Sequence, residues 1–187
     1  MAIVLASSSP RRADLLRAAG FSFTVDPVDV DESALPGETP EGHVRRLARA
    51  KAQAGLNRHP ERTVLGADTV VVVDGRILGK PRDAAEAAAM LTALSGRVHH
   101  VFTGVAVARS GIVRDAVDVS AVTFAPMPPD EIAAYVASGE PLDKAGAYAI
   151  QGWASRYINR LEGSYSGVVG LPVAVVHQLL ITLSPDT

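Results

Sequence analysis

The sequence contains no cysteine, so disulfide bonds, thiol nucleophiles and cysteine-ligated zinc are excluded. Aromatic residues make up only 5% of the chain, so we expect an aliphatic core. The formal net charge is -2, which offers no broad positive surface to nucleic acid or to an anionic membrane. No apolar run approaches the roughly 20 residues of a membrane-spanning helix, and the N-terminus is apolar first and basic after, the reverse of a secretory signal. We therefore expect a cytoplasmic protein with no membrane or nucleic-acid partner, built as a single domain over residues 1–187.

Several common site motifs are also missing. The chain has no GxGxxG or GxSxG motif, and its five histidines show no metal-ligand spacing. The segment Gly75–Lys80 has one residue too few between its glycines for a P-loop, and Pro81 stands where serine or threonine should follow the lysine. These absences exclude the most familiar nucleotide-binding, serine-hydrolase and zinc-enzyme patterns.

The most informative stretch that is present is TVLGADTVVVVDGRILGKPRD, residues 63–83. Four consecutive valines favour a strand that is buried on both faces, and Asp74-Gly75 between apolar runs is a strong hairpin signal. Asp68 therefore lies in or beside a buried strand, where a carboxylate is costly unless it is paired. One interpretation is structural, with Asp68 capping a turn or pairing with Lys80. The other is a general base or metal ligand; a nucleophile is disfavoured because Val70 stands where an aspartyl-phosphate enzyme has a second aspartate.

The rest of the chain alternates between strand and helix patterns with short connections, which argues for an α/β fold. We expect strands at 2–6, 21–25, 97–109 and 157–162, and one or two strands over 112–124. We expect helices at 10–19, 84–94, 130–138 and 173–183, and one that starts within 39–42 and runs to about residue 57. Residues 26–40 and 163–172 are predicted as loops, and 139–152 shows few helix or strand signals.

The first predicted helix has an unusual start. Ser9 before Pro10 is typical of a helix N-terminus, with the serine hydroxyl as cap. Arg11 and Arg12 then occupy the first turn, where the helix dipole disfavours cations, so either an anion binds there or the arginines are simply solvated. Lys51 stands among alanines in the second helix, so its stem can lie against the protein while its ammonium reaches a site. Several cations around one buried carboxylate suit a nucleoside triphosphate with a divalent cation.

Five motifs then carry a resemblance: SSSPRR, GADTVV, GKPRD, DKAGAYAIQG and GSYSGVVGLP. In this order they resemble the Maf family of nucleoside triphosphate pyrophosphatases, over nearly the whole chain. The resemblance implies an α/β fold with a long curved mixed sheet, flanking helices and two lobes around a cleft, similar to inosine triphosphate pyrophosphatases. It also implies hydrolysis between the α- and β-phosphates with Mg²⁺ or Mn²⁺, and a possible homodimer.

The resemblance assigns roles to individual residues. Arg11, Thr69 and Gln151 match the branch that hydrolyses dTTP, UTP and modified pyrimidine nucleotides, and the Gln151 amide has both a donor and an acceptor for a pyrimidine edge. Asp68 is expected as the catalytic base and, with Glu32, as a metal ligand. Phosphate binding is expected from Ser7, Arg12, Lys51 and Lys80. The alternatives are an N7-methyl-GTP pyrophosphatase and a non-enzymatic nucleotide-binding regulator of cell division.

Overall fold

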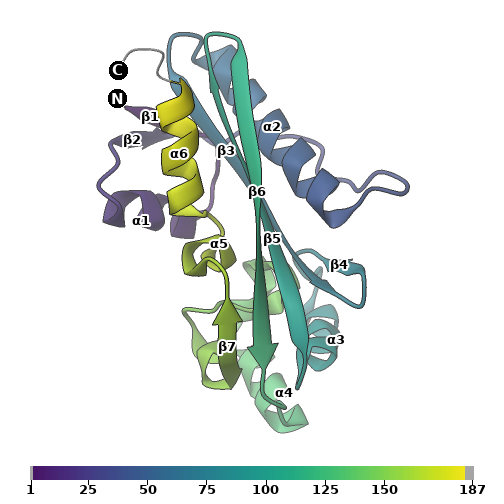
Figure 1. The fold of residues 1–187 in the computed structure, drawn as a ribbon. Coiled ribbons are helices and arrows are strands. Elements are labelled where there is room, and N and C mark those ends of the chain that lie inside the picture. The colour runs from purple at the N-terminus through teal and green to yellow at the C-terminus, as the bar shows by residue number, and fades with distance from the viewer. Residues whose placement is uncertain (1, 184–187) are drawn as a thin grey trace. The chain divides into compact units, whose positions relative to one another are not determined.

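A computed structural model describes residues 2–183, in which strands and helices alternate as the sequence predicts (Figure 1). The chain forms two compact units. Unit 1 comprises the chain up to Thr69, then Thr103–Asp118, and the part from Gly170 onward. Unit 2 comprises Val70–Phe102 and Val119–Val169. No helix within residues 2–183 is both long enough and apolar enough to cross a membrane.

The strands form one seven-stranded sheet, in the order β2-β1-β3-β5-β6-β7 with β4 paired to β3. The strands are β1 (Ile3–Leu5), β2 (Phe23–Val25), β3 (Thr63–Val73), β4 (Arg76–Leu78), β5 (Val98–Arg109), β6 (Ile112–Phe124) and β7 (Ile158–Glu162). β1 is parallel to β2 and β3, whereas β4 is antiparallel to β3 and β7 to β6. The predicted α/β class with a mixed sheet is therefore confirmed, and residues 112–124 form one strand rather than two.

In unit 1 the strands are covered on both faces by α1 (Pro10–Ala18), α2 (Pro40–Arg58) and α6 (Val173–Leu183). Successive side chains of a strand point to opposite faces, and the two cores follow this alternation. Ile3 and Leu5 of β1 belong to the cluster that contains Leu16 of α1, whereas Val4 belongs to the cluster that contains Ala52 of α2. This two-sided cover explains why β1 and β3 are apolar at almost every position.

The backbone of α2 lies directly against β3 and β5. A Cβ atom on Gly66 of β3 would collide with the carbonyl oxygen of Ala48, and one on Gly104 of β5 would collide with that of Val44. The surrounding cluster consists largely of alanine and valine, so no bulky side chain separates the helix from the strands. This close approach lets a side chain on α2 reach the polar residues of β3.

Unit 2 packs its core between the sheet and the helices α3 (Ala84–Leu94) and α4 (Pro129–Ala137). Its connections contain the short 3-10 helices η1 (Glu140–Asp143), η2 (Ala145–Ala147) and η3 (Trp153–Tyr157), and one further helix, α5 (Tyr165–Val169). The prediction of a continuous loop over 163–172 is therefore wrong. Ser164 Oγ accepts the N–H of Gly167 and starts α5, a local cap hidden by the glycine-rich composition.

The hairpin predicted at Asp74-Gly75 is confirmed. Val73 of β3 pairs with Arg76 of β4, and the two turn residues have φ of 51° and 73°. Positive φ at both central positions is typical of a type I′ turn, whose twist matches that of the flanking strands. The valine run of β3 is thus fixed on one edge by a short antiparallel partner.

Candidate active site

The core of the candidate site is a buried ion pair in unit 1. Lys51 of α2 donates from Nζ to Asp68 Oδ1 of β3 over 2.8 Å, and the same Nζ lies 2.6 Å from Glu32 Oε1. Asp68 is 8% exposed and Lys51 is 7% exposed, whereas the Glu32 side chain is 57% exposed. One ammonium group therefore lies between a buried and a half-solvated carboxylate. In the structural interpretation drawn from the sequence, Lys80 is the ion-pair partner of Asp68. In the structure that partner is Lys51.

The position of Lys51 follows from the packing of α2. Its side chain is buried, and its ammonium reaches Asp68 of β3 because Gly66 lets the two backbones come close together. Leaving this ammonium unpaired at such a depth would be costly, and the two carboxylates offset that cost.

A second cation, Arg12 of α1, lies in the same unit. Its guanidinium donates to Ser7 Oγ at 3.0 Å, to Thr69 Oγ1 at 3.1 Å and to the Gly170 carbonyl oxygen at 2.8 Å. These three acceptors are neutral. Burial lowers the pKa of Arg12, and the negative charge of Asp68 acts in the opposite direction. Because arginine stays protonated in proteins, Arg12 is a fixed positive charge held by neutral oxygens and suited to an anion.

The start of α1 differs from the prediction in its cap. Ser9 occupies the N-cap position but makes no side-chain hydrogen bond to the helix, so the predicted hydroxyl cap is wrong. The Ser7 hydroxyl accepts the N–H of Ser9 at 3.3 Å and a hydrogen bond from Arg12 at 3.0 Å, so it fixes the residue before the helix rather than capping the helix. Arg11 lies beside Arg12 in the first turn of α1, as predicted.

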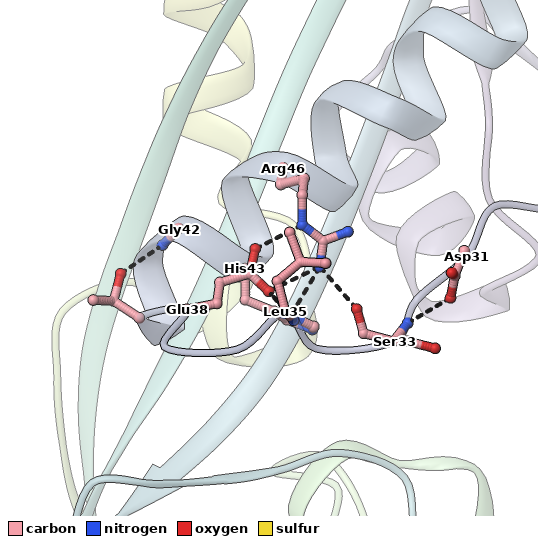
Figure 2. A network of polar contacts seen from close by, with 8 residues as sticks. Asp31, Ser33, Leu35, Glu38, Gly42, His43 and Arg46 are labelled. Carbon is pink, nitrogen blue, oxygen red and sulfur yellow. Dashed lines mark hydrogen bonds and ion pairs between the residues drawn. The ribbon is translucent and has the colours of Figure 1, made fainter.

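The loop that carries Glu32 is held against α2 by a network of polar contacts that was not predicted from the sequence. Figure 2 shows Arg46 pointing from α2 onto this loop. Arg46 donates to Glu38 Oε1 at 2.6 Å, to Glu38 Oε2 at 2.8 Å and to the Ser33 carbonyl oxygen at 3.0 Å. His43 Nδ1 lies 2.9 Å from Glu38 Oε2. Hydrogen bonds from Arg46 hold the pKa of Glu38 well below its usual range. An acidic loop followed by a basic helix is the signal that would have indicated this pairing.

The remaining predicted site residues belong to unit 2. Lys80 is exposed and follows β4; the Gly79 carbonyl oxygen next to it accepts the Gly146 N–H at 3.0 Å. Gln151 is exposed between η2 and η3. Unit 1 thus brings together the cluster of Glu32, Lys51 and Asp68 and the cluster of Ser7, Arg12 and Thr69. Lys80 and Gln151 lie on polar connections of the other unit.

The carboxylates fit a divalent cation only in part. Among residues 2–183, no three aspartate, glutamate or histidine side chains gather into a ready set of metal ligands. Asp68 and Glu32 do converge, because both approach the same Lys51 nitrogen. Mg²⁺ in nucleotide sites is usually held by one or two carboxylates, with substrate phosphates and water completing its shell. The two converging carboxylates therefore supply the number of protein ligands that is usual for such a site.

Comparison with known proteins identifies the family. A family model described as Maf-like protein matches residues 2–183. The chain belongs to the Maf family. The resemblance drawn from the five motifs is thus confirmed, and it extends over the whole described part of the chain.

Curated relatives of this Maf protein are similar over almost their full length. The dTTP/UTP pyrophosphatase of Geotalea uraniireducens is 54% identical over 177 residues, which are 93% of this chain and 91% of the relative. The dTTP/UTP pyrophosphatase of Geobacter metallireducens is 52% identical over 184 residues, 97% of this chain and 95% of the relative.

Solved structures with a similar fold are more distant in sequence. The Ham1 protein of Staphylococcus aureus has a TM-score of 0.54 at 17% identity, over 98% of this chain and all of its own. A protein of Vibrio cholerae has a TM-score of 0.51 at 13% identity, over 98% of this chain and 96% of its own. At these identities the likeness concerns the fold alone.

Proposed function

We propose that this Maf protein hydrolyses dTTP and UTP, and modified pyrimidine nucleotides of the same shape, to the monophosphate and pyrophosphate. The observation that carries the proposal is the buried Asp68, paired with Lys51, whose ammonium also contacts Glu32, in a chain 54% identical to a dTTP/UTP pyrophosphatase. A protein that only binds triphosphates gains nothing from a buried carboxylate, which repels them. A hydrolase needs such a group to take a proton from water.

The proposed reaction uses Asp68 as the general base. A water molecule attacks the α-phosphorus and gives its proton to Asp68, while the bond from that phosphorus to the α–β bridging oxygen breaks and pyrophosphate leaves with that oxygen. Arg12, Lys51 and Lys80 offset the negative charge of the phosphates and of the leaving group. The Ser7 hydroxyl, which already orients Arg12, adds a donor for a phosphate oxygen.

Asp68 and Glu32 are the residues that would hold Mg²⁺ or Mn²⁺. When bound, the cation would offset phosphate charge and lower the pKa of water, which makes a weak carboxylate base sufficient. In the structure Lys51 occupies the position between these carboxylates. A divalent cation held by these two carboxylates would therefore compete with the Lys51 ammonium.

Base selection is proposed for Gln151, with Arg11 and Thr69. The exposed Gln151 amide presents one donor group and one acceptor, which match the edge of a pyrimidine. Thr69 follows Asp68 directly, and its hydroxyl already contacts Arg12 and Thr103. The proposal includes a cytoplasmic location, where nucleoside triphosphates are consumed, and a homodimer as the assembly.

A substrate panel tests the proposal. The purified protein is incubated with dTTP, UTP, N7-methyl-GTP and dGTP in the presence of Mg²⁺ or Mn²⁺, and the products are separated. We expect dTMP and UMP together with pyrophosphate. Formation of dTDP and inorganic phosphate from dTTP would overturn the proposed cleavage between the α- and β-phosphates. A preference for N7-methyl-GTP would assign the protein to the N7-methyl-GTP branch of the family. Nucleotide binding without hydrolysis would favour the non-enzymatic regulator of cell division.

A further inference from the structure

The segment that carries Gln151 is held by one buried tyrosine of α4. The Ala149 N–H donates to Tyr135 Oη over 3.3 Å. The ring of Trp153 stacks on the Tyr135 ring, with centroids 4.8 Å apart and planes inclined by 11°. Tyr135 therefore contacts the chain two residues before Gln151 and two residues after it. All of these residues belong to unit 2.

Tyr135 is itself tightly fixed. Its side chain is fully buried, and its hydroxyl donates to Glu140 Oε1 over 2.9 Å. The Glu140 carboxylate also lies against the turn after Gln151, because a Cβ atom on Gly152 would collide with Oε1. Burial raises the pKa of Tyr135, so its hydroxyl stays protonated and keeps donating to Glu140 at neutral and alkaline pH.

Neither Trp153 nor Tyr135 has a place in the chemistry proposed above. Gln151 is a flexible, exposed side chain, and an amide discriminates between bases only when its donor and its acceptor are held in a defined direction. The contacts of Tyr135 restrict the backbone on both sides of Gln151. Its hydroxyl forms hydrogen bonds with the Ala149 N–H and the Glu140 carboxylate, and its ring stacks on the Trp153 ring.

We propose that Tyr135 is a positioning residue for base selection, which fixes the direction of the Gln151 amide through Ala149, Glu140 and Trp153. The inference rests on the proposed function, since it requires Gln151 to face the base. It predicts that loss of the Tyr135 hydroxyl reduces discrimination between bases more than it reduces turnover of the preferred substrate. The contacts of Asp68 and Lys51 lie within unit 1, so they are not altered by this change.

The test uses Tyr135→Phe, which keeps the ring and its stacking on Trp153 and removes only the hydroxyl. A matched control is Tyr157→Phe, because the Tyr157 ring also contacts Trp153 and its hydroxyl is influenced by the Glu131 carboxylate. The ratio of kcat/KM for dTTP to that for dGTP is measured in both variants. One net hydrogen bond corresponds to roughly a twofold to tenfold effect, so we expect the ratio to fall by about that factor in Tyr135→Phe and to stay unchanged in Tyr157→Phe.

A second readout does not depend on activity. Amide hydrogen exchange at Ala149 is expected to be faster in Tyr135→Phe than in the wild type, and unchanged in Tyr157→Phe. Unaltered exchange at Ala149 would overturn the inference whatever the kinetics. Faster exchange with an unchanged kcat/KM ratio would reduce Tyr135 to a purely structural role and overturn the inference as well. A wild-type protein that hydrolyses no triphosphate would instead refute the proposed function, while the exchange rates would still report whether Tyr135 orders the segment.

Discussion

Replacing Lys51 with methionine removes the cation that joins Asp68 to Glu32 and keeps an unbranched apolar stem in its place. The side chains of Lys51 and Asp68 are only 9% and 11% exposed, so both members of this ion pair are deeply buried. The Glu32 side chain is 57% exposed and can turn into water. The effect of the substitution therefore depends mainly on Asp68, which is left as a buried charge with its ammonium partner removed.

The magnitude follows from this burial. Removing one partner of a buried ion pair costs about 3–5 kcal/mol, whereas the exposed Glu32 contributes little. For a protein of this size, about 2–4 °C of melting temperature is lost per kcal/mol, so we expect Lys51→Met to melt roughly 6–20 °C below the wild type. Adding Mn²⁺ is expected to raise the melting temperature of this variant more than that of the wild type, because the carboxylates are left without the competing ammonium.

A double-mutant cycle with Asp68→Asn isolates the pair. Free energies of unfolding in urea are measured for the wild type, Lys51→Met, Asp68→Asn and the double variant. If the two residues form the buried pair, the double variant is expected to be more stable than the sum of the single effects predicts, by about 1–3 kcal/mol. Additivity within about 0.5 kcal/mol would refute the pairing and the burial argument built on it.

Two further predictions concern groups outside this pair. Burial lowers the pKa of His99 from 6.5 to about 4, so the unfolded chain binds its proton first as the pH falls. Stability should therefore drop between about pH 6.5 and 4 by about 3 kcal/mol, and His99→Gln should remove that part of the pH dependence in urea titrations at several pH values. Arg46→Lys loses the two-pronged contact with Glu38, so the loop carrying Glu32 should loosen; the Mn²⁺ concentration for half-maximal activity is expected to rise several-fold with a smaller change in kcat. An Mn²⁺ dependence equal to that of the wild type would contradict a positioning role for Arg46.

The fold was predictable because local signals agree with the tertiary structure. The valine run of β3 and the Asp74-Gly75 turn specify a buried hairpin by themselves, and α3 and α6 have the predicted bounds. The short helix α5 was missed because serine and glycine dominate its surroundings. Its N-terminal bond from Gly167 to Ser164 is visible only in three dimensions.

The candidate site was predictable as a set of residue types but not as a set of contacts. The burial of Asp68 follows from its strand, yet the sequence suggests Lys80 as its ion-pair partner, whereas the structure pairs it with Lys51. The choice depends on how closely α2 approaches β3, which Gly66 permits. Tyr135 illustrates the same limit. In the sequence it is one apolar position of an amphipathic helix, and its hydroxyl acquires a partner only when residues 140 and 149 fold back onto α4.

The most direct test of the central claim compares dTTP hydrolysis by the wild type and by Asp68→Asn, with Mg²⁺ and with pyrophosphate as the measured product. Asparagine keeps the size of the side chain and removes its charge and basicity, so binding of dTTP should persist. Loss of a general base lowers rates by roughly 10²–10⁴-fold, and we expect kcat of Asp68→Asn to fall within that range. Release of pyrophosphate by Asp68→Asn at the wild-type rate would contradict the account.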